Sequence, residues 1–186
     1  LKAEGKIRYL GFSFHDSYQA FEEMLCARDW DFCQIQLNYM DTNEQAGMKG
    51  YKLTEERNIP LVIMEPIKGG MLANFGADIK KKFNELDPEA SVASFALRWV
   101  SSLPNVKVVL SGMSNMEQLL DNTDYMADFQ PLNEQEKELV AKAVDVINAN
   151  IAIPCTGCSY CTEGCPMHIA IPKYFSLYNL DKQESE

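Results

Sequence analysis

The chain has 186 residues, which allows one domain of ordinary size or one domain with a small appendage. Hydrophobic residues make up 46% and charged residues 24%, so intrinsic disorder and fibrous classes are excluded. The formal net charge of −10 argues against a general nucleic-acid binder, and no apolar run has the length of a membrane span. We recognise no secretory leader, so we expect a cytoplasmic protein that binds neither nucleic acid nor membrane.

The first 125 residues alternate short strands with amphipathic helices. Strands are expected at residues 6–13, 32–37, 60–64 and 106–110. Helices are expected at 16–28, with Asp16 as N-cap, and at 43–57, 91–101 and from 114 onward. The run at 60–64 is apolar throughout and the run at 106–110 is apolar except for Lys107, a pattern typical of strands buried on both faces. Four successive strand-helix units predict an α/β fold with a parallel sheet.

The remaining residues contain no further strand signal. Asn133 to Glu136 has the form of a capping box, and an apolar stripe continues the predicted helix to about residue 148. A cysteine-rich loop follows, and then a short helix at 172–180. We therefore divide the chain into a domain at 1–150 and a tail at 151–186.

The tail contains the most specific motif of the sequence. Four of the six cysteines form the pattern C-x2-C-x2-C-x3-C-P, which is the bacterial ferredoxin signature for a [4Fe–4S] cluster. Two residues between thiolates allow a tight loop to surround the corners of a cubane. The predicted ligands are Cys155, Cys158, Cys161 and Cys165.

Other interpretations of this motif stay open. Four thiolates can also hold structural zinc, although zinc sites more often pair two C-x2-C segments, and a disulfide framework is disfavoured in a cytosolic chain. The fourth cysteine of such a run serves a second cluster in two-cluster ferredoxins. Either Cys165 closes the same cluster or Cys26 or Cys33 completes it, and we expect these last two to be core residues.

Four segments, taken in order, resemble an aldo/keto reductase from its fifth strand onward. They are EGKIRYLGFS at 4–13, QIQLNY at 34–39, MEPIKGGML at 64–72 and SGMSNMEQL at 111–119. With the cysteine motif, the chain is similar to the branch of that family that ends in a ferredoxin-type cluster. The resemblance implies the C-terminal half, four β/α units, of a TIM (β/α)8 barrel, followed by a small α-helical iron–sulfur tail.

The resemblance also implies an activity, the transfer of a hydride between NADP or NAD and a small carbonyl compound. By position, Ser13 and Gln34 would hold the nicotinamide carboxamide. Met64 stands where the family usually has an aromatic residue that stacks on the nicotinamide ring.

Three further sets of nucleotide-binding positions follow from the resemblance. Pro66, Ile67 and Gly69 would line the pyrophosphate, and Gly112 and Ser114 the adenosine phosphate. The adenine and ribose would be faced by Gln118, Asp121 and Asn122. Met113 and Gln118 stand near positions where many relatives have basic side chains that clamp a 2′-phosphate, so the choice between NADP and NAD stays open.

The aldo/keto reductase tetrad of aspartate, tyrosine, lysine and histidine falls in the first four barrel units, which this chain does not contain. We therefore expect a piece of a longer protein, starting at Leu1, that is inactive alone. A partner would be the N-terminal barrel half, a second copy of the chain or a redox protein. The competing functions are a non-enzymatic electron-transfer or interaction module and a structural zinc protein.

Overall fold

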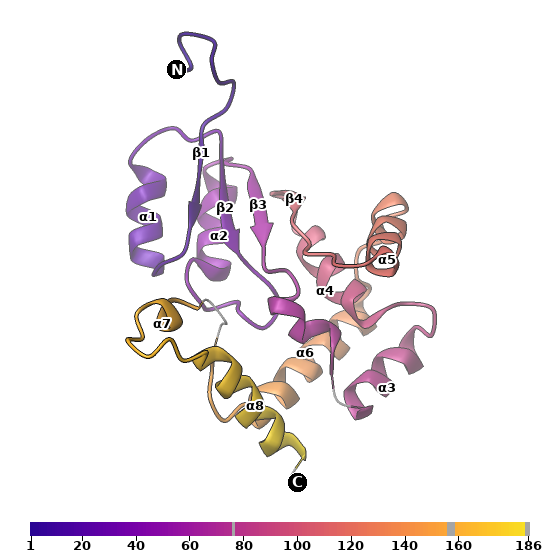
Figure 1. The fold of residues 1–186 in the computed structure, drawn as a ribbon. Helices are drawn as coiled ribbons and strands as arrows, with labels where there is room; N and C mark the ends of the chain where they lie inside the picture. The colour runs from indigo at the N-terminus through magenta and orange to yellow at the C-terminus, as the bar shows by residue number, and fades with distance from the viewer. Residues whose placement is uncertain (76, 156–158, 185–186) are drawn as a thin grey trace. The chain divides into compact units, whose positions relative to one another are not determined.

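The computed structural model describes residues 1–75, 77–155 and 159–184 (Figure 1). The chain divides into two compact units, Leu1–Lys137 and Glu138–Glu186. The boundary between these units falls inside a long helix, α6 (Glu134–Asn150). The division at residue 150 that the sequence suggests stays a prediction.

The first unit is built on a four-stranded parallel sheet. Its strands are β1 (Gly11–Phe14), β2 (Phe32–Gln36), β3 (Leu61–Met64) and β4 (Val106–Val109), and they pair in chain order. Figure 1 shows the strands side by side with their carboxyl ends at the same edge. The predicted parallel sheet is therefore confirmed, and every connection between neighbouring strands contains a helix.

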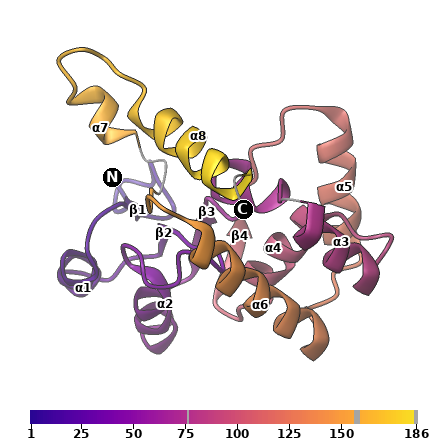
Figure 2. The ribbon, with the colours of Figure 1, turned by 90° about the horizontal axis from the view of Figure 1, so that it is seen from below.

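The helices α1 (Tyr18–Cys26), α2 (Gly47–Glu56) and α4 (Val92–Ser101) lie along one face of the sheet (Figure 2). The core fills the space between them and the strands. Phe14, Cys33, Ile35, Leu61 and Ile63 enter it from the sheet. Because side chains alternate along a strand, the residues between these positions face the other side of the sheet.

The first strand and helix are shorter than the sequence predicts. Strand β1 begins at Gly11 rather than at residue 6, and α1 ends at Cys26. The N-cap of α1 is Ser17, whose Oγ accepts a hydrogen bond from the backbone N–H of Ala20, so the assignment of Asp16 was wrong. Asp16 instead accepts a hydrogen bond from the backbone N–H of Ser17 at 2.6 Å.

The strands at 60–64 and 106–110 were expected to be buried on both faces, and this expectation was wrong. In β3, Leu61 and Ile63 are buried whereas Val62 and Met64 are only half-buried. In β4, Val108 remains 47% exposed. Within the described residues, β4 has a strand neighbour on one side only, which explains its exposure.

Helix α2 starts four residues later than the predicted start at residue 43. A turn leads into the helix, and in it Gln45 and Gly47, the first residue of α2, both have positive φ, +52° and +51°. The backbone N–H of Met48 donates to the carbonyl of Thr42 at 2.7 Å and closes this turn. The turn therefore uses residues that the apolar periodicity assigned to the helix.

Replacing Gly47 by alanine is expected to destabilise this turn. A Cβ at Gly47 would lie 2.5 Å from the Thr42 carbonyl oxygen, which is backbone and cannot rotate away, and the φ of +51° is unfavourable for alanine. We expect Gly47→Ala to lower the free energy of unfolding by about 1–3 kcal/mol, measured by urea denaturation. Gly112→Ala is the control, since among the described residues no atom outside its chain neighbours lies within 4 Å of a Cβ placed there, and equal losses in the two variants would refute this account.

The remaining elements of the first unit follow strands β3 and β4. The 3-10 segment η1 (Lys68–Ala73) and α3 (Ala77–Leu86) precede α4, and neither was predicted. Helix α4 is capped by Ser91, as the predicted start at residue 91 implies. After β4 comes α5 (Met116–Ala127), capped by Asn115.

The start of α6 belongs to the first unit and is tied to α4. Asn133 and Glu136 exchange the two hydrogen bonds of a capping box, at 2.7 and 3.0 Å, which confirms that prediction. Both carboxylate oxygens of Glu136 also accept hydrogen bonds from the guanidinium of Arg98, at 2.7 and 3.0 Å. The side chains of this pair are only 10% and 5% exposed.

The second unit contains the rest of α6, a single turn α7 (Tyr160–Glu163) and α8 (Ile171–Glu184). Helix α8 is longer at both ends than the predicted 172–180. Its Asn179 accepts from the backbone N–H of Ile153 and donates to the Ile153 carbonyl, both at 2.9 Å. The chain before the cysteine motif is thereby held to α8.

Among the helices described, we find none that is both long and apolar enough to cross a membrane.

Candidate functional site

Three of the predicted nucleotide-binding residues meet on the sheet face opposite the core. The strand register pairs Ser13 with Gln34 and Gln36 with Met64. The side-chain amide of Gln34 donates to Ser13 Oγ and contacts Met64 Sδ, each at 3.3 Å. Ser13 is exposed, and the other two are half-buried. Because β1, β2 and β3 run parallel, their carboxyl ends bring these residues together.

The loop after β3 carries the next three predicted residues. Pro66 is buried, Ile67 is half-buried and Gly69 is exposed. The backbone N–H of Gly69 donates to the carboxylate of Glu65 at 2.7 Å. The loop therefore presents a glycine backbone donor that already holds an anionic group.

The last group of predicted residues surrounds the amino end of α5. Gln118 accepts from the backbone N–H and the hydroxyl of Ser114, at 2.8 and 3.1 Å, and both residues are exposed. Gly112, two residues earlier, is also exposed. From residue 110 to residue 128 the sequence contains four acidic residues and no lysine or arginine.

Asp121 and Asn122 have structural partners of their own. Asp121 accepts a hydrogen bond from the Ser91 hydroxyl at 2.6 Å, which links α5 to the N-cap of α4. Asn122 is buried and donates to Ser111 Oγ at 3.0 Å. Their contact with a nucleotide stays a prediction.

A buried polar cluster that follows strands β2 and β3 was not predicted from the sequence. Asp41 Oδ2 accepts from the side-chain amides of Gln36 and Asn38, both at 3.0 Å. Its other oxygen forms an ion pair with the ammonium group of Lys68. The sequence does contain a signal for it, because residues 34, 36 and 38, which share one face of the strand, are all polar. We define Gln36, Asn38, Asp41 and Lys68 as the Asp41 cluster.

Tyr39 lies between two members of this cluster in sequence but does not join it. Its side chain is 4% exposed, its ring packs edge to face against Trp99, and its hydroxyl has no hydrogen-bond partner among the described residues. Burial raises the pKa of Tyr39 well above its ordinary value. Burial therefore disfavours the phenolate form of this side chain.

The cysteine motif belongs to the second unit. Cys161 lies on α7 and is exposed, while Cys155 and Cys165 are half-buried. Backbone N–H groups of Ile169, Met167 and His168 lower the pKa of the Cys165 thiol. Cys158 lies outside the described residues.

The predicted metal site stays a prediction. The donor chemistry fits a cluster, because thiolates that accept backbone hydrogen bonds are the usual ligands of iron–sulfur centres. However, within residues 1–75, 77–155 and 159–184, no three histidine, cysteine or carboxylate side chains gather in a metal-binding arrangement.

The two remaining cysteines differ in their environment. Cys33 is fully buried in the core of the first unit, as expected, and burial raises the pKa of its thiol to about 12. Cys26 is exposed rather than in the core, so that expectation was wrong. Its sulfur accepts a hydrogen bond from the Arg57 guanidinium at 3.5 Å.

This difference predicts how the thiols react. In the native chain at pH 8, we expect iodoacetamide to label Cys33 more than about 100-fold more slowly than Cys26, because the thiolate is the nucleophile and the buried thiol stays protonated. Peptide mass spectrometry measures both rates, and denaturation in urea should equalise them. Similar rates in the native chain would show that Cys33 is accessible.

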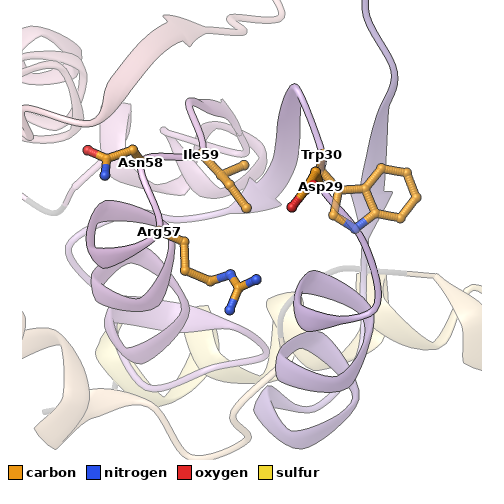
Figure 3. A pocket seen from close by; sticks show the side chains of 5 residues that line it. All are labelled: Asp29, Trp30, Arg57, Asn58 and Ile59. Atoms are coloured by element: carbon orange, nitrogen blue, oxygen red, sulfur yellow. The ribbon is translucent and has the colours of Figure 1, made fainter. Parts of the chain in front are cut away.

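A shallow depression of about 280 Å³ lies at the edge of the sheet formed by the amino ends of the strands (Figure 3). It is lined by Asp29, Trp30, Arg57, Asn58 and Ile59, which precede β2 and β3. Active sites of parallel barrels lie at the carboxyl ends of the strands, whereas the amino ends serve stability. We therefore place the candidate site at the edge that carries Ser13, Gln34 and Met64.

The sequence matches the model of the aldo/keto reductase family over residues 1–145. The chain belongs to the aldo/keto reductase family. A search of curated proteins gave no match. The family model ends before the cysteine motif, so membership concerns the sheet, its helices and most of α6.

Solved aldo-keto reductases share the fold of this family member. The holo form of an enzyme from Bacillus halodurans superposes with a TM-score of 0.60 at 22% identity, over 76% of this chain and 52% of that one. An enzyme from Klebsiella pneumoniae in complex with NADPH gives 0.58 at 20% identity, over 77% of this chain and 50% of that one. The chain thus spans about half the length of these relatives.

Proposed function

We propose that this chain is the C-terminal half of an NADP- or NAD-dependent aldo/keto reductase that reduces a small carbonyl compound or oxidises an alcohol. The observation that carries the proposal is the meeting of Ser13, Gln34 and Met64 at the carboxyl edge of a parallel sheet. Family membership and the NADPH bound to the Klebsiella enzyme support it.

In this proposal the residues of the site bind and orient the cofactor. Gln34 and Ser13 offer an amide and a hydroxyl to the nicotinamide carboxamide, and Met64 packs beside the ring. Pro66, Ile67 and Gly69 receive the diphosphate. When bound, the nicotinamide exchanges a hydride with the substrate.

The adenosine end lies at α5 in this proposal. Gly112 and Ser114 approach its phosphate, and Gln118, Asp121 and Asn122 face the adenine and ribose. We assign no catalytic acid to this chain. The proton donor comes from the preceding four β/α units, which also pair with the edges of β1 and β4 that have no strand neighbour among the residues described.

The nucleotide proposal is tested by titrating the chain, alone and joined to an N-terminal half-barrel, with NADH and with NADPH. Saturable binding of at least one dinucleotide, followed by the change in nicotinamide fluorescence, is expected for the joined protein. Gln34→Ala should weaken this binding about tenfold, because a hydrogen-bonded amide is lost. Absence of binding of either dinucleotide to the joined protein would overturn the proposal. Dinucleotide binding by a self-associated form of the chain alone would identify a second copy as the other half.

We further propose that Cys155, Cys158, Cys161 and Cys165 hold a [4Fe–4S] cluster. The spacing of the motif supports this assignment, and such a cluster would either pass electrons to a redox partner or stabilise the tail. Anaerobic reconstitution should give about four irons per chain and a broad visible absorption. Cys161→Ser should lose both, whereas Cys26→Ser should lose neither. One tightly held zinc in a colourless protein would show the structural zinc alternative instead.

A further inference from the structure

The loop of residues 65–70, which runs from the end of β3 into the first residues of η1, has an unusual backbone. Glu65, Lys68, Gly69 and Gly70 all have positive φ, of +54°, +48°, +62° and +93°. Two of them are not glycine, and each such conformation costs on the order of 1–3 kcal/mol and persists only where the surrounding structure imposes it. Hydrogen bonds within the segment hold part of this shape, since the N–H of Gly69 donates to the Glu65 carboxylate and that of Gly70 to the Ile67 carbonyl, and contacts from outside residues 65–70 add to them.

The Asp41 cluster supplies two contacts that hold it. The side-chain amide of Asn38 donates to the carbonyl oxygen of Glu65 at 3.0 Å, at the first positive-φ residue. The ammonium group of Lys68, at the second, is bound to the carboxylate of Asp41. The loop after β3 is thus fixed from the segment that follows β2.

Asp41 itself is held in place on several sides. Its Oδ2 accepts from Gln36 and Asn38, both at 3.0 Å, and its backbone N–H donates to Asn38 Oδ1 at 2.9 Å. The side chains of Asp41 and Lys68 are only 5% and 9% exposed. A buried ion pair adds little stability compared with a well-packed apolar pair, so its value lies in the geometry that it imposes.

We propose that Asp41 is a positioning residue that, through Lys68, keeps the loop of residues 65–70 preorganised to receive the diphosphate of a dinucleotide. This inference rests on the proposed function. In this proposal Lys68 tethers the loop and does not itself bind phosphate, because its ammonium group is already neutralised by the buried carboxylate of Asp41. Preorganisation raises affinity because the loop need not be ordered when the ligand binds.

A direct role for Lys68 makes the opposite prediction for one variant. Asp41→Asn removes the negative charge and frees the ammonium group. If Lys68 were itself the cation that binds phosphate, this variant would bind the dinucleotide more tightly. If Asp41 positions the loop, the variant binds about tenfold more weakly, and adding Lys68→Met to it changes little, because both substitutions break the same tether.

The experiment measures dinucleotide affinity and hydrogen exchange of the Gly69 and Gly70 amides in the full-length protein. NADH and NADPH are the probes, and the variants are Asp41→Asn, Lys68→Met and the double variant. The positioning role predicts weaker binding together with faster exchange at both amides. Unchanged or tighter binding in Asp41→Asn, or unchanged exchange, would overturn it.

Two controls separate this role from a general loss of stability. Glu136→Gln weakens a buried ion pair elsewhere in the first unit, and it should leave both the affinity and the loop exchange unchanged. Asp145→Asn makes the same chemical change at an exposed position. If the wild-type protein binds no dinucleotide, the proposed function fails, and the exchange rates still decide whether Asp41 holds the loop.

Discussion

Replacing Glu136 by alanine is expected to lower the free energy of unfolding by about 3–5 kcal/mol, because it leaves the buried Arg98 guanidinium without its carboxylate. Arg98 keeps its hydrogen bond to the carbonyl of Gln130 at 2.8 Å, but this neutral acceptor does not compensate a charge. The same substitution removes the acceptor for the backbone N–H of Asn133 and so breaks the capping box. Chemical denaturation followed by circular dichroism measures the loss.

A nearby substitution is the matched control for this prediction. Glu134→Ala removes a carboxylate from the same turn of α6, but its pair with Lys137 is exposed, with 86% of the Glu134 side chain accessible. We expect a change within about 0.5 kcal/mol, as for other surface pairs. Replacing both Arg98 and Glu136 by apolar residues should recover most of the loss. If Glu136→Ala were as mild as the control, the ion pair would not anchor α6 to α4.

Much of the fold could be predicted because strands and helices leave different periodicities in the sequence. The segments at 32–37, 60–64 and 106–110, rich in strand-forming residues, predicted three strands to within one residue at each end. Helix starts were less accurate where residues with positive φ interrupt the chain, as at Gly47. Apolar periodicity does not report such turns, since they depend on backbone hydrogen bonds.

The elements between β3 and α4 illustrate a second limit. Gly69 and Gly70 have positive φ inside η1, and a glycine pair usually indicates only a turn. In α3, Phe83 stacks on Phe75 and is fully buried, although half of the ten residues of this helix are charged. Ile79, Phe83 and Leu86 nevertheless have the i, i+4, i+7 spacing of an amphipathic helix, so the sequence carried a signal for α3 that the prediction missed.

The contacts of the candidate site also divide into those that the sequence predicts and those that it does not. Contact between Ser13, Gln34 and Met64 follows from a parallel sheet, because equivalent strand ends lie at one edge. The ion pair of Asp41 with Lys68 joins residues that are 27 positions apart and on two different loops, and no local pattern relates them. Contacts of this kind depend on the tertiary structure and become visible only there.

Replacing Phe21 by alanine is expected to lower the free energy of unfolding by about 3–5 kcal/mol, the range for large-to-small substitutions at fully buried aromatic positions. Phe21 lies on α1 with no exposed surface, and its ring contacts those of Phe14 and Phe12 at centroid distances of 5.2 and 6.0 Å. A Cβ on Gly50 would lie 3.1 Å from the same ring, so α2 also packs closely here. The cavity left by alanine would therefore face a sheet and two helices, which cannot all close around it.

The test of this prediction also distinguishes effects on core stability from effects on dinucleotide binding. Phe21→Leu keeps most of the volume and should lose less than about 1.5 kcal/mol, and Met24→Ala, on the exposed side of α1, should change stability by about 0.5 kcal/mol or less. Ser13 and Phe14 are neighbours on β1 but point to opposite faces of the sheet. Below its unfolding transition, Phe21→Ala should therefore keep the dinucleotide affinity of the full-length protein within about twofold of wild type. A large loss of affinity in the folded variant would mean that the helix-covered face of the sheet also determines the geometry of Ser13 and Gln34.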